Sequence, residues 1–212
     1  IPMAALWTWW RDDNPRWSSL GDMKGAASLA HVYGKPRVAA ESMTSAAALW
    51  DFAPRDLKRI VDMEFAQGVN LPVIHTSVHV PVEDHKPGLS LLSFGQTFNR
   101  NETWADMAGP WIDYIARSAY MLQQGRNVAD IALFTGDDAP LSARFYEGPP
   151  PGLPTRFAYD FVNPRMLSEA ISSKDGKLVS EGGASWQVLW LGRGRRALTS
   201  RTLERLRDLA EA

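Results

Sequence analysis

Short apolar runs that alternate with amphipathic helices are the feature that most restricts the fold of this chain. The runs lie at 37–40, 71–74 and 128–134, and a predicted helix separates each run from the next. Buried strands that alternate with helices are typical of a parallel β-sheet with helices against it. Polar residues follow each run at its carboxyl end: Glu41, His75, Asp137 and Asp138. Because the active site of a (β/α) barrel lies at the carboxyl ends of its strands, these residues are the first candidates for a functional site.

The predicted helices have clear signals at their ends. Pro54 begins a helix that Gly68 ends, and its apolar residues recur at helical spacing: Leu57, Ile60, Val61 and Phe65. A longer helix is predicted over 103–124, with a kink or a restart at Pro110. Residues 21–33 are also predicted to be helical, whereas 7–17 are expected to form a loop. We therefore expect the three strands to be parallel neighbours, with their carboxyl ends on one face of the sheet.

Composition excludes several functional classes. The 212 residues are 45% hydrophobic and 22% charged, as in globular domains, and the formal net charge of −1 argues against a nucleic-acid-binding domain. Cysteine is absent, which excludes disulfides, thiolate zinc sites and cysteine nucleophiles. No apolar run approaches the roughly 20 residues that a membrane span needs. Nine tryptophans are unusual, and exposed indoles suit sugar rings, although packing in the core is their commoner use.

The second part of the chain differs in composition. A segment rich in proline and glycine at 139–158 is predicted to be a linker between 1–138 and 159–212. After it we expect a short helix, a hairpin turn at 174–177, a buried strand at 187–191 and a helix capped by Thr199 or Ser200. This order indicates the beginning of a second α/β domain. A basic cluster is interpreted as a solvated loop: Arg193, Arg195 and Arg196.

Motifs between residues 26 and 138 resemble glycoside hydrolase family 106, the α-L-rhamnosidases. The match rests on the order and spacing of ASLAHVYGKP (27–36), AESMT (40–44), GVNLPVIH (68–75), HVP (79–81), PG (87–88), FGQTFNR (94–100), TW (103–104), LQQG (122–125) and AD (129–130). Residues 159–212 resemble the start of the glutamine-amidotransferase-like domain that follows the barrel in this family. The resemblance implies a partial (β/α)8 TIM barrel, comprising the last few strands in 1–138, and then a partial flavodoxin-like α/β domain.

The resemblance also implies a function. It predicts a bacterial glycosidase that hydrolyses terminal α-L-rhamnosyl linkages of a glycoside or polysaccharide with inversion, located in the periplasm or secreted. Family members are longer than this chain, so its partners would include flanking parts of its own protein, and the isolated chain is expected to be inactive. Calcium is the cofactor that the family implies, but no calcium-binding loop is identified and the metal ligands are unknown.

Glu41 is the candidate catalytic residue. Inverting glycosidases hold two carboxyl groups roughly 6.5–9.5 Å apart, and burial can raise the pKa of the one that acts as acid. The resemblance implies a glutamate pair and leaves open whether Glu41 is the acid or the base. Alternatively, Glu41 caps a helix or forms an ion pair. Glu102, Asp137 and Asp138 are candidates for the second carboxylate, although we expect the partner on an earlier strand outside this chain.

Four further residues are candidates for substrate binding. His75 and His79 are expected to hydrogen-bond sugar hydroxyls, in preference to forming a zinc pair, because the segment between them is a poor helix former. Arg100 and Trp104 flank the start of the long helix, and each either contacts the sugar or anchors the preceding loop. Asn70 precedes a strand and is expected at the opposite end of the sheet, where polar groups serve stability.

Two other functions compete with a glycosidase. The first is a non-catalytic carbohydrate-binding or scaffold module, in which the tryptophans and histidines hold a sugar without cleaving it. A second carboxylate opposite Glu41 favours the enzyme, and its absence favours the binding module. The other is a histidine-based metal hydrolase, which metal analysis would test.

Overall fold

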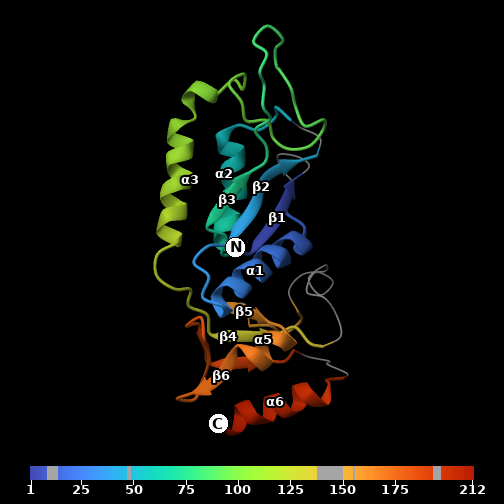
Figure 1. Ribbon diagram of the computed structural model, residues 1–212, viewed down its shortest axis with the longest axis vertical. Coiled ribbons are helices and arrows are strands. Elements are labelled where there is room, and N and C mark those ends of the chain that lie inside the picture. Colours follow the sequence, from blue (N-terminus) through green and yellow to red (C-terminus); the bar gives the residue numbers. More distant parts are fainter. Residues whose placement is uncertain (9–13, 47–48, 138–149, 155, 193–196) are drawn as a thin grey trace.

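The computed structural model describes residues 1–8, 14–46, 49–137, 150–154, 156–192 and 197–212. Within these ranges the strands form three sheets, A, B and C, arranged along one long axis (Figure 1). Sheet A and its helices lie at one end, while sheets B and C and the last helix lie at the other. Helix α1 (Trp17–Val32) lies between the two parts. No helix within the described ranges is long and apolar enough to cross a membrane.

Sheet A is parallel and has the strand order β1-β2-β3: β1 (Met3–Thr8), β2 (Ala39–Ser45) and β3 (Leu71–Ile74). β2 and β3 confirm two of the expected strands. β2 extends four residues past Glu41, where the predicted strand ended. β1 lies in a region for which no strand was predicted, because two of its six residues are small alanines that give a weak apolar signal.

The two faces of sheet A have different surroundings. Leu6 of β1 and Ser42 of β2 are buried against the helices that cover one face, α1 and α2 (Pro54–Ala66). Met3 of β1 and Val73 of β3 point to the opposite face and are exposed. Glu41 pairs in register with Val73. Because side chains alternate along a strand, Glu41 faces the same exposed side as Val73.

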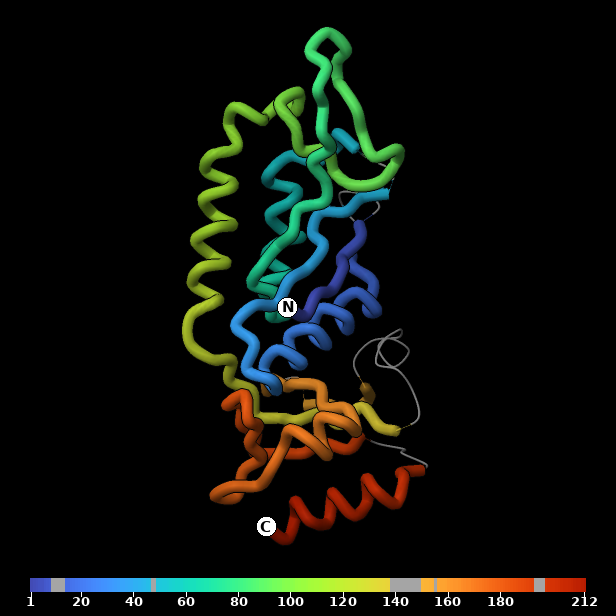
Figure 2. The backbone as a smooth tube through the Cα atoms, viewed as in Figure 1, coloured from blue at the N-terminus to red at the C-terminus, as the bar shows by residue number. Residues whose placement is uncertain are grey.

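The helices next to sheet A follow the sequence signals closely. Pro54 occupies the first turn of α2, and the backbone N–H of Ala53 donates to Asp56 there. The predicted restart at Pro110 is confirmed, since a 3₁₀ turn, η1 (Ala105–Met107), precedes α3 (Gly109–Leu122). Between β3 and η1, a long loop projects from the end of the molecule that is farthest from α6 (Figure 2).

Sheets B and C form the second part of the molecule. Sheet B is parallel, in the order β5-β4-β9: β4 (Ile131–Phe134), β5 (Tyr159–Val162) and β9 (Val188–Trp190). Sheet C is antiparallel: β6 (Ile171–Lys174), β7 (Lys177–Ser180) and β8 (Ser185–Trp186). Its hairpin turn was predicted, and the side chain of Thr199 caps α6 (Ser200–Glu211) as expected, while α5 (Pro164–Glu169) follows β5.

The expectation that all three predicted strands share one sheet is wrong. β4 pairs with β5 and β9 and not with β3. All four residues of β4 are buried, which any central strand of a parallel sheet requires, so the apolar run alone could not show which sheet it joins. The domain limits, the partial barrel and the flavodoxin-like domain stay predictions, but a limit at 138 would separate β4 from its partners. Most of the predicted linker 139–158 lies outside the described residues, as does the basic cluster 193–196.

A buried polar network joins α1 to sheet B. Nδ1 of His31 on α1 donates to Asp160 of β5 at 2.7 Å, and Nε1 of Trp186 donates to the other carboxylate oxygen at 3.1 Å. Nearby, the backbone N–H of Phe161 donates to the Ser28 hydroxyl at 2.9 Å. Burial acts to raise the pKa of Asp160, but the hydrogen bonds from His31 and Trp186 and the positive charges of His31 and Lys24 outweigh it, so this pKa is lowered. The network therefore holds a charged group between the two parts of the molecule.

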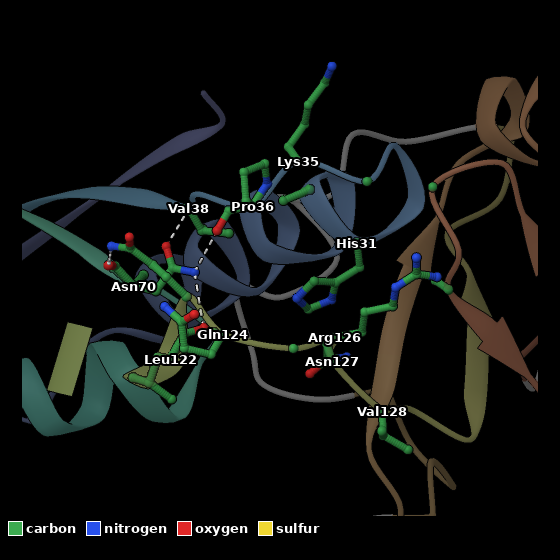
Figure 3. Close-up of a pocket in the computed structure, with 18 of the residues that line it drawn as sticks. His31, Lys35, Pro36, Val38, Asn70, Leu122, Gln124, Arg126, Asn127 and Val128 are labelled. Atoms are coloured by element: carbon green, nitrogen blue, oxygen red, sulfur yellow. Dashed lines mark hydrogen bonds between the residues drawn. The ribbon is translucent and has the colours of Figure 1, made fainter. Parts of the chain in front are cut away.

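Asn70 forms hydrogen bonds that join several segments at the amino ends of β2 and β3 (Figure 3). Its Oδ1 accepts from the backbone N–H of Val38 at 2.8 Å, and its Nδ2 donates to the carbonyl of Pro36 at 3.0 Å and that of Leu122 at 3.4 Å. Gln123 donates to the backbone carbonyl of Asn70 at 2.7 Å. Asn70 lies at the end of the sheet opposite Glu41, as expected, and it links three segments there.

The Asp160 network predicts a pH-dependent stability. Since folding lowers the pKa of Asp160, its contribution is present above the unfolded pKa and is lost as the pH falls through the folded one. Asp160→Asn should reduce the free energy of unfolding at neutral pH by about 1.5–3 kcal/mol. Urea unfolding over a pH series should show this difference shrinking in acid. Asp113→Asn, in an exposed pair with Arg117, is the control and should have little effect at any pH. A difference for Asp160 that did not vary with pH would contradict the prediction.

Asn70→Ala should destabilise the protein by about 1–3 kcal/mol, because it leaves the buried N–H of Val38 without its acceptor. Thermal or urea unfolding measures this loss. Asn127→Ala is the matched control, since Asn127 is exposed beside the same segment and its loss should cost under about 0.5 kcal/mol. Equal effects of the two substitutions would show that the Asn70 hydrogen bonds do not brace the sheet.

Candidate active site

Glu41 and His75 meet beside the carboxyl end of β3, where the irregular part of β2 begins. His75 directly follows β3, and its backbone N–H donates to the carbonyl of Ser42 at 2.9 Å. Nδ1 of His75 lies 3.9 Å from Oε1 of Glu41, longer than a hydrogen bond but close enough for electrostatic attraction when the imidazole is protonated. The Glu41 side chain is 29% exposed and that of His75 27% exposed. The structure therefore brings together two of the five predicted site residues.

A β-bulge in β2 sets the direction of Glu41. Ala5 pairs with Glu41, but the next pair joins Trp7 to Thr44, so three steps along β2 match two along β1. Met43, inside the bulge, has φ of 65°, an unusual value for a residue that is not glycine. The Thr44 hydroxyl donates to Oε1 of Glu41 at 2.6 Å. Bulges often redirect a side chain next to an active site, and here the extra residue places the hydroxyl of Thr44 against the Glu41 carboxyl.

A second carboxyl group lies behind the bulge, on the covered face of sheet A. Glu64 of α2 is fully buried, and burial raises its pKa to about 8, although the Ser42 hydrogen bond acts to lower it. The Ser42 hydroxyl lies 2.6 Å from Oε2 of Glu64. Sequence reasoning did not consider Glu64 or Thr44. The signal for Glu64 was present, since it interrupts the apolar stripe of Leu57, Ile60 and Val61 at helical spacing.

The long loop after His75 is docked against the ends of β2 and β3. The backbone N–H of Gly95 donates to the carbonyl of Ser45 at 2.7 Å, and that of Thr76 donates to the carbonyl of Gln96 at 2.8 Å. Glu102 is buried beneath this loop, where it accepts from the backbone N–H of Thr103 at 2.9 Å and from the Gln96 amide at 3.4 Å. Its carboxylate is thus engaged in holding the loop.

Arg100 and Trp104 make contacts that anchor the loop. The Arg100 guanidinium donates to the carbonyls of Val80 and Val82 at 2.9 and 2.7 Å. Nε1 of Trp104 donates to the carbonyl of Phe52 at 3.2 Å, and its ring packs edge-on against another aromatic ring in the same region. His79 is exposed on the loop. The anchoring alternative thus has observed contacts for Arg100 and Trp104, while sugar binding by these three residues stays a prediction.

Asp137 lies in the other part of the molecule. It follows β4, and its carboxylate accepts from the backbone N–H of Thr199 at 2.9 Å and from the Thr202 hydroxyl at 2.8 Å. These contacts fix the beginning of α6, so Asp137 is not the carboxylate that faces Glu41. Asp138 lies outside the described residues.

An aromatic pair lies at the same end of sheet A as Glu41. The rings of Trp7, near the end of β1, and Phe94, on the long loop, meet edge-on with centroids 5.8 Å apart. They are 38% and 42% exposed. The unusual tryptophan content indicated sugar-binding surfaces in general, but nothing in the sequence paired these two rings.

The described residues do not form a metal centre. In these ranges no group of three or more His, Cys, Asp or Glu side chains is placed to hold a metal ion. His75 and His79 therefore belong to no such group there. Calcium, the cofactor that the family implies, stays a prediction.

A cavity of about 530 Å³ lies at the opposite end of sheet A (Figure 3). It is lined by the end of α1, the residues that precede β2 and β3, and the turn at 182–184. Gly34 and Gly182 approach closely here, since a Cβ on Gly182 would lie 2.1 Å from the backbone nitrogen of Gly34. Because this cavity is at the amino ends of the strands, it is separate from the site around Glu41.

Comparison with known proteins identifies the family. Residues 1–212 match the model of glycoside hydrolase family 106, described as alpha-L-rhamnosidase. The chain belongs to this family. A solved structure of a rhamnosidase from Novosphingobium sp. PP1Y is 55% identical and matches 99% of this chain with a TM-score of 0.94. A curated relative from Formosa agariphila, named "Putative beta-glucuronidase", is 38% identical over 188 residues, or 89% of this chain.

The family 106 resemblance predicted from the motifs is thus confirmed over the whole chain. The chain spans 20% of the solved rhamnosidase and 16% of the Formosa relative. It is therefore similar to a limited portion of much longer family 106 proteins, and the site around Glu41 belongs to that portion.

Proposed function

We propose that this chain is part of a glycosidase that hydrolyses terminal α-L-rhamnosyl linkages with inversion at the anomeric carbon. The observation that carries the proposal is the position of Glu41 on a bulged strand of a parallel sheet, beside the carboxyl end of β3 and on the same face as the exposed Val73. Family membership and the rhamnosidase neighbour support the reaction class and the sugar. A periplasmic or secreted location is part of the same proposal, and cell fractionation tests it.

Glu41 supplies one of the two carboxyl groups that the reaction needs. One carboxylic acid gives its proton to the oxygen of the breaking glycosidic bond, while a carboxylate takes a proton from the water that attacks the anomeric carbon. The products are rhamnose of inverted configuration and the free alcohol. Since Glu102 holds the long loop and Asp137 holds the beginning of α6, we assign the second group to a part of the longer protein outside this chain.

Neighbouring groups suit a bound rhamnosyl unit. His75, next to Glu41, can hydrogen-bond a sugar hydroxyl. Rhamnose is a deoxy sugar with a methyl group, and the exposed rings of Trp7 and Phe94 offer an apolar surface at the same end of the sheet. Thr44 holds the Glu41 carboxyl in one orientation, which limits the conformational freedom that would be lost during the reaction.

Glu41→Gln in the full-length protein should lower kcat by roughly 10²–10⁴-fold while the melting temperature stays near that of wild type. Glutamine keeps the size and an acceptor but cannot exchange a proton, so kcat should change more than KM. Hydrolysis of aryl α-L-rhamnosides measures the effect, and aryl β-glucuronides test the activity named for the Formosa relative. Glu83→Gln, on the exposed loop, is the control.

Two results would contradict this proposal. A folded Glu41→Gln variant with undiminished kcat would remove Glu41 from the mechanism. A full-length wild-type protein that binds rhamnosides without cleaving them would instead support the carbohydrate-binding alternative.

The isolated 212-residue chain should be inactive on rhamnosides and should self-associate. Among the described residues, β1 and β3 are the edge strands of sheet A, and Met3 and Val73 on one face of it are exposed, as are apolar residues of α3 such as Met121. Uncovered strand edges and apolar patches favour association. Light scattering and a rhamnoside assay of the purified chain check this, and a monomer with full turnover would contradict it.

A further inference from the structure

Glu64 is a buried carboxyl group that, among the described residues, is hydrogen-bonded to an uncharged hydroxyl. It lies on the face of α2 that packs against β2, and its side chain is completely buried. Oε2 is 2.6 Å from the Ser42 hydroxyl, whereas Oε1 is buried and has no hydrogen-bond partner among the described residues. An ionised carboxylate in such a place is costly, while a neutral carboxylic acid is tolerated.

The contacts of Ser42 indicate which group donates. Its Oγ lies 2.6 Å from Oε2 of Glu64 and also 3.2 Å from the carbonyl oxygen of Ala40. A hydroxyl has one proton and can donate to only one of these oxygens. If Glu64 is neutral, its own O–H donates to Ser42, and Ser42 donates to Ala40. Both short contacts are then hydrogen bonds.

Ser42 lies at the point where this chain of hydrogen bonds can act on the active site. It directly follows Glu41 and begins the bulge that ends at Thr44. Its backbone carbonyl accepts from the N–H of His75 at 2.9 Å. The side chain of Ser42 is therefore held by Glu64 on the covered face of sheet A, while its backbone carbonyl holds His75, which lies next to Glu41.

We propose that Glu64 is a positioning residue, which fixes the bulge through the Ser42 hydroxyl and so aims Glu41 and His75 at the substrate. The inference rests on the proposed role of Glu41. Glu64 itself does not touch the substrate, because the sheet lies between them.

The surroundings of Glu64 give this arrangement a pH dependence. Glu41 lies on the other face of β2, and the charged residues Asp62 and Lys58 of α2 are on an exposed side of that helix, where they bind Tyr114 of α3. Burial raises the pKa of Glu64 to about 8, so the acid is neutral below that pH. As the pH rises through this value Glu64 loses its proton, Ser42 must donate to the carboxylate, and the bond to Ala40 is lost. Because folding raises this pKa from 4.5, the stability that the neutral form provides is complete below about pH 4.5 and is lost progressively as the pH rises to about 8.

The test compares three variants of the full-length enzyme. Glu64→Gln keeps a donor but cannot ionise, so it should retain most of the turnover and lose the decline of kcat above about pH 8. Glu64→Met has similar length but no donor, and kcat should fall roughly 10–100-fold with a smaller change in KM. Ser42→Ala interrupts the same chain and should behave like Glu64→Met. Glu204→Gln, exposed on α6, is the control.

Two further measurements keep the test independent of activity. Infrared difference spectra should show a neutral carboxyl band that titrates near pH 8 and is absent from Glu64→Gln. Crystal structures of Glu64→Met or Ser42→Ala should show a displaced bulge. An unmoved bulge, or an unchanged kcat and pH profile in folded Glu64→Met, would overturn the inference even if Glu41→Gln is inactive. Full turnover of Glu41→Gln would overturn the proposed function instead.

Discussion

The structure depends on helix α1, which packs against two sheets at once. Met23, Ala27 and Ala30 of α1 belong to the apolar core under sheet A, whereas Val32 joins the core under sheet B. Between these contacts, Ser28 and His31 reach β5 through polar atoms. A helix buried on more than one side cannot rely on a single apolar stripe. Because Asp160 is hydrogen-bonded to His31, α1 can bury a second, partly polar side against protein.

This two-sided burial also explains what the sequence could and could not predict. α2 and α6 each have an apolar stripe and recognisable caps, so their positions followed from periodicity and from Pro54 or Thr199. α1 was recognised only in part, because small residues on several sides conceal its period. β4 was recognised as a buried strand, but pairing between strands depends on contacts remote in sequence. Its predicted place in sheet A was therefore wrong, because local sequence patterns do not indicate which strands pair.

The candidate site divides in the same way. Glu41 and His75 were predicted because each follows an apolar run, and the parallel register makes them neighbours even though β2 continues past Glu41. The bulge could not be predicted, since it needs an unpaired residue and a positive φ at Met43, an ordinary side chain. The sequence signal for Glu64 was different, namely a charged residue inside the apolar stripe of α2. Its chemistry differs from that of Glu41 because the sheet separates an exposed carboxyl from a buried one.

The contact between Gly34 and Gly182 has a consequence for how such proteins can change over evolutionary time. The two backbones are so close that neither position has room for a side chain. A side chain at either position therefore requires the other backbone to move, although some 150 positions lie between them. A recombination event that exchanged sheets B and C for those of another protein would have to bring along a matching glycine turn. It would also need an acceptor for His31, so the two parts cannot be exchanged independently of each other.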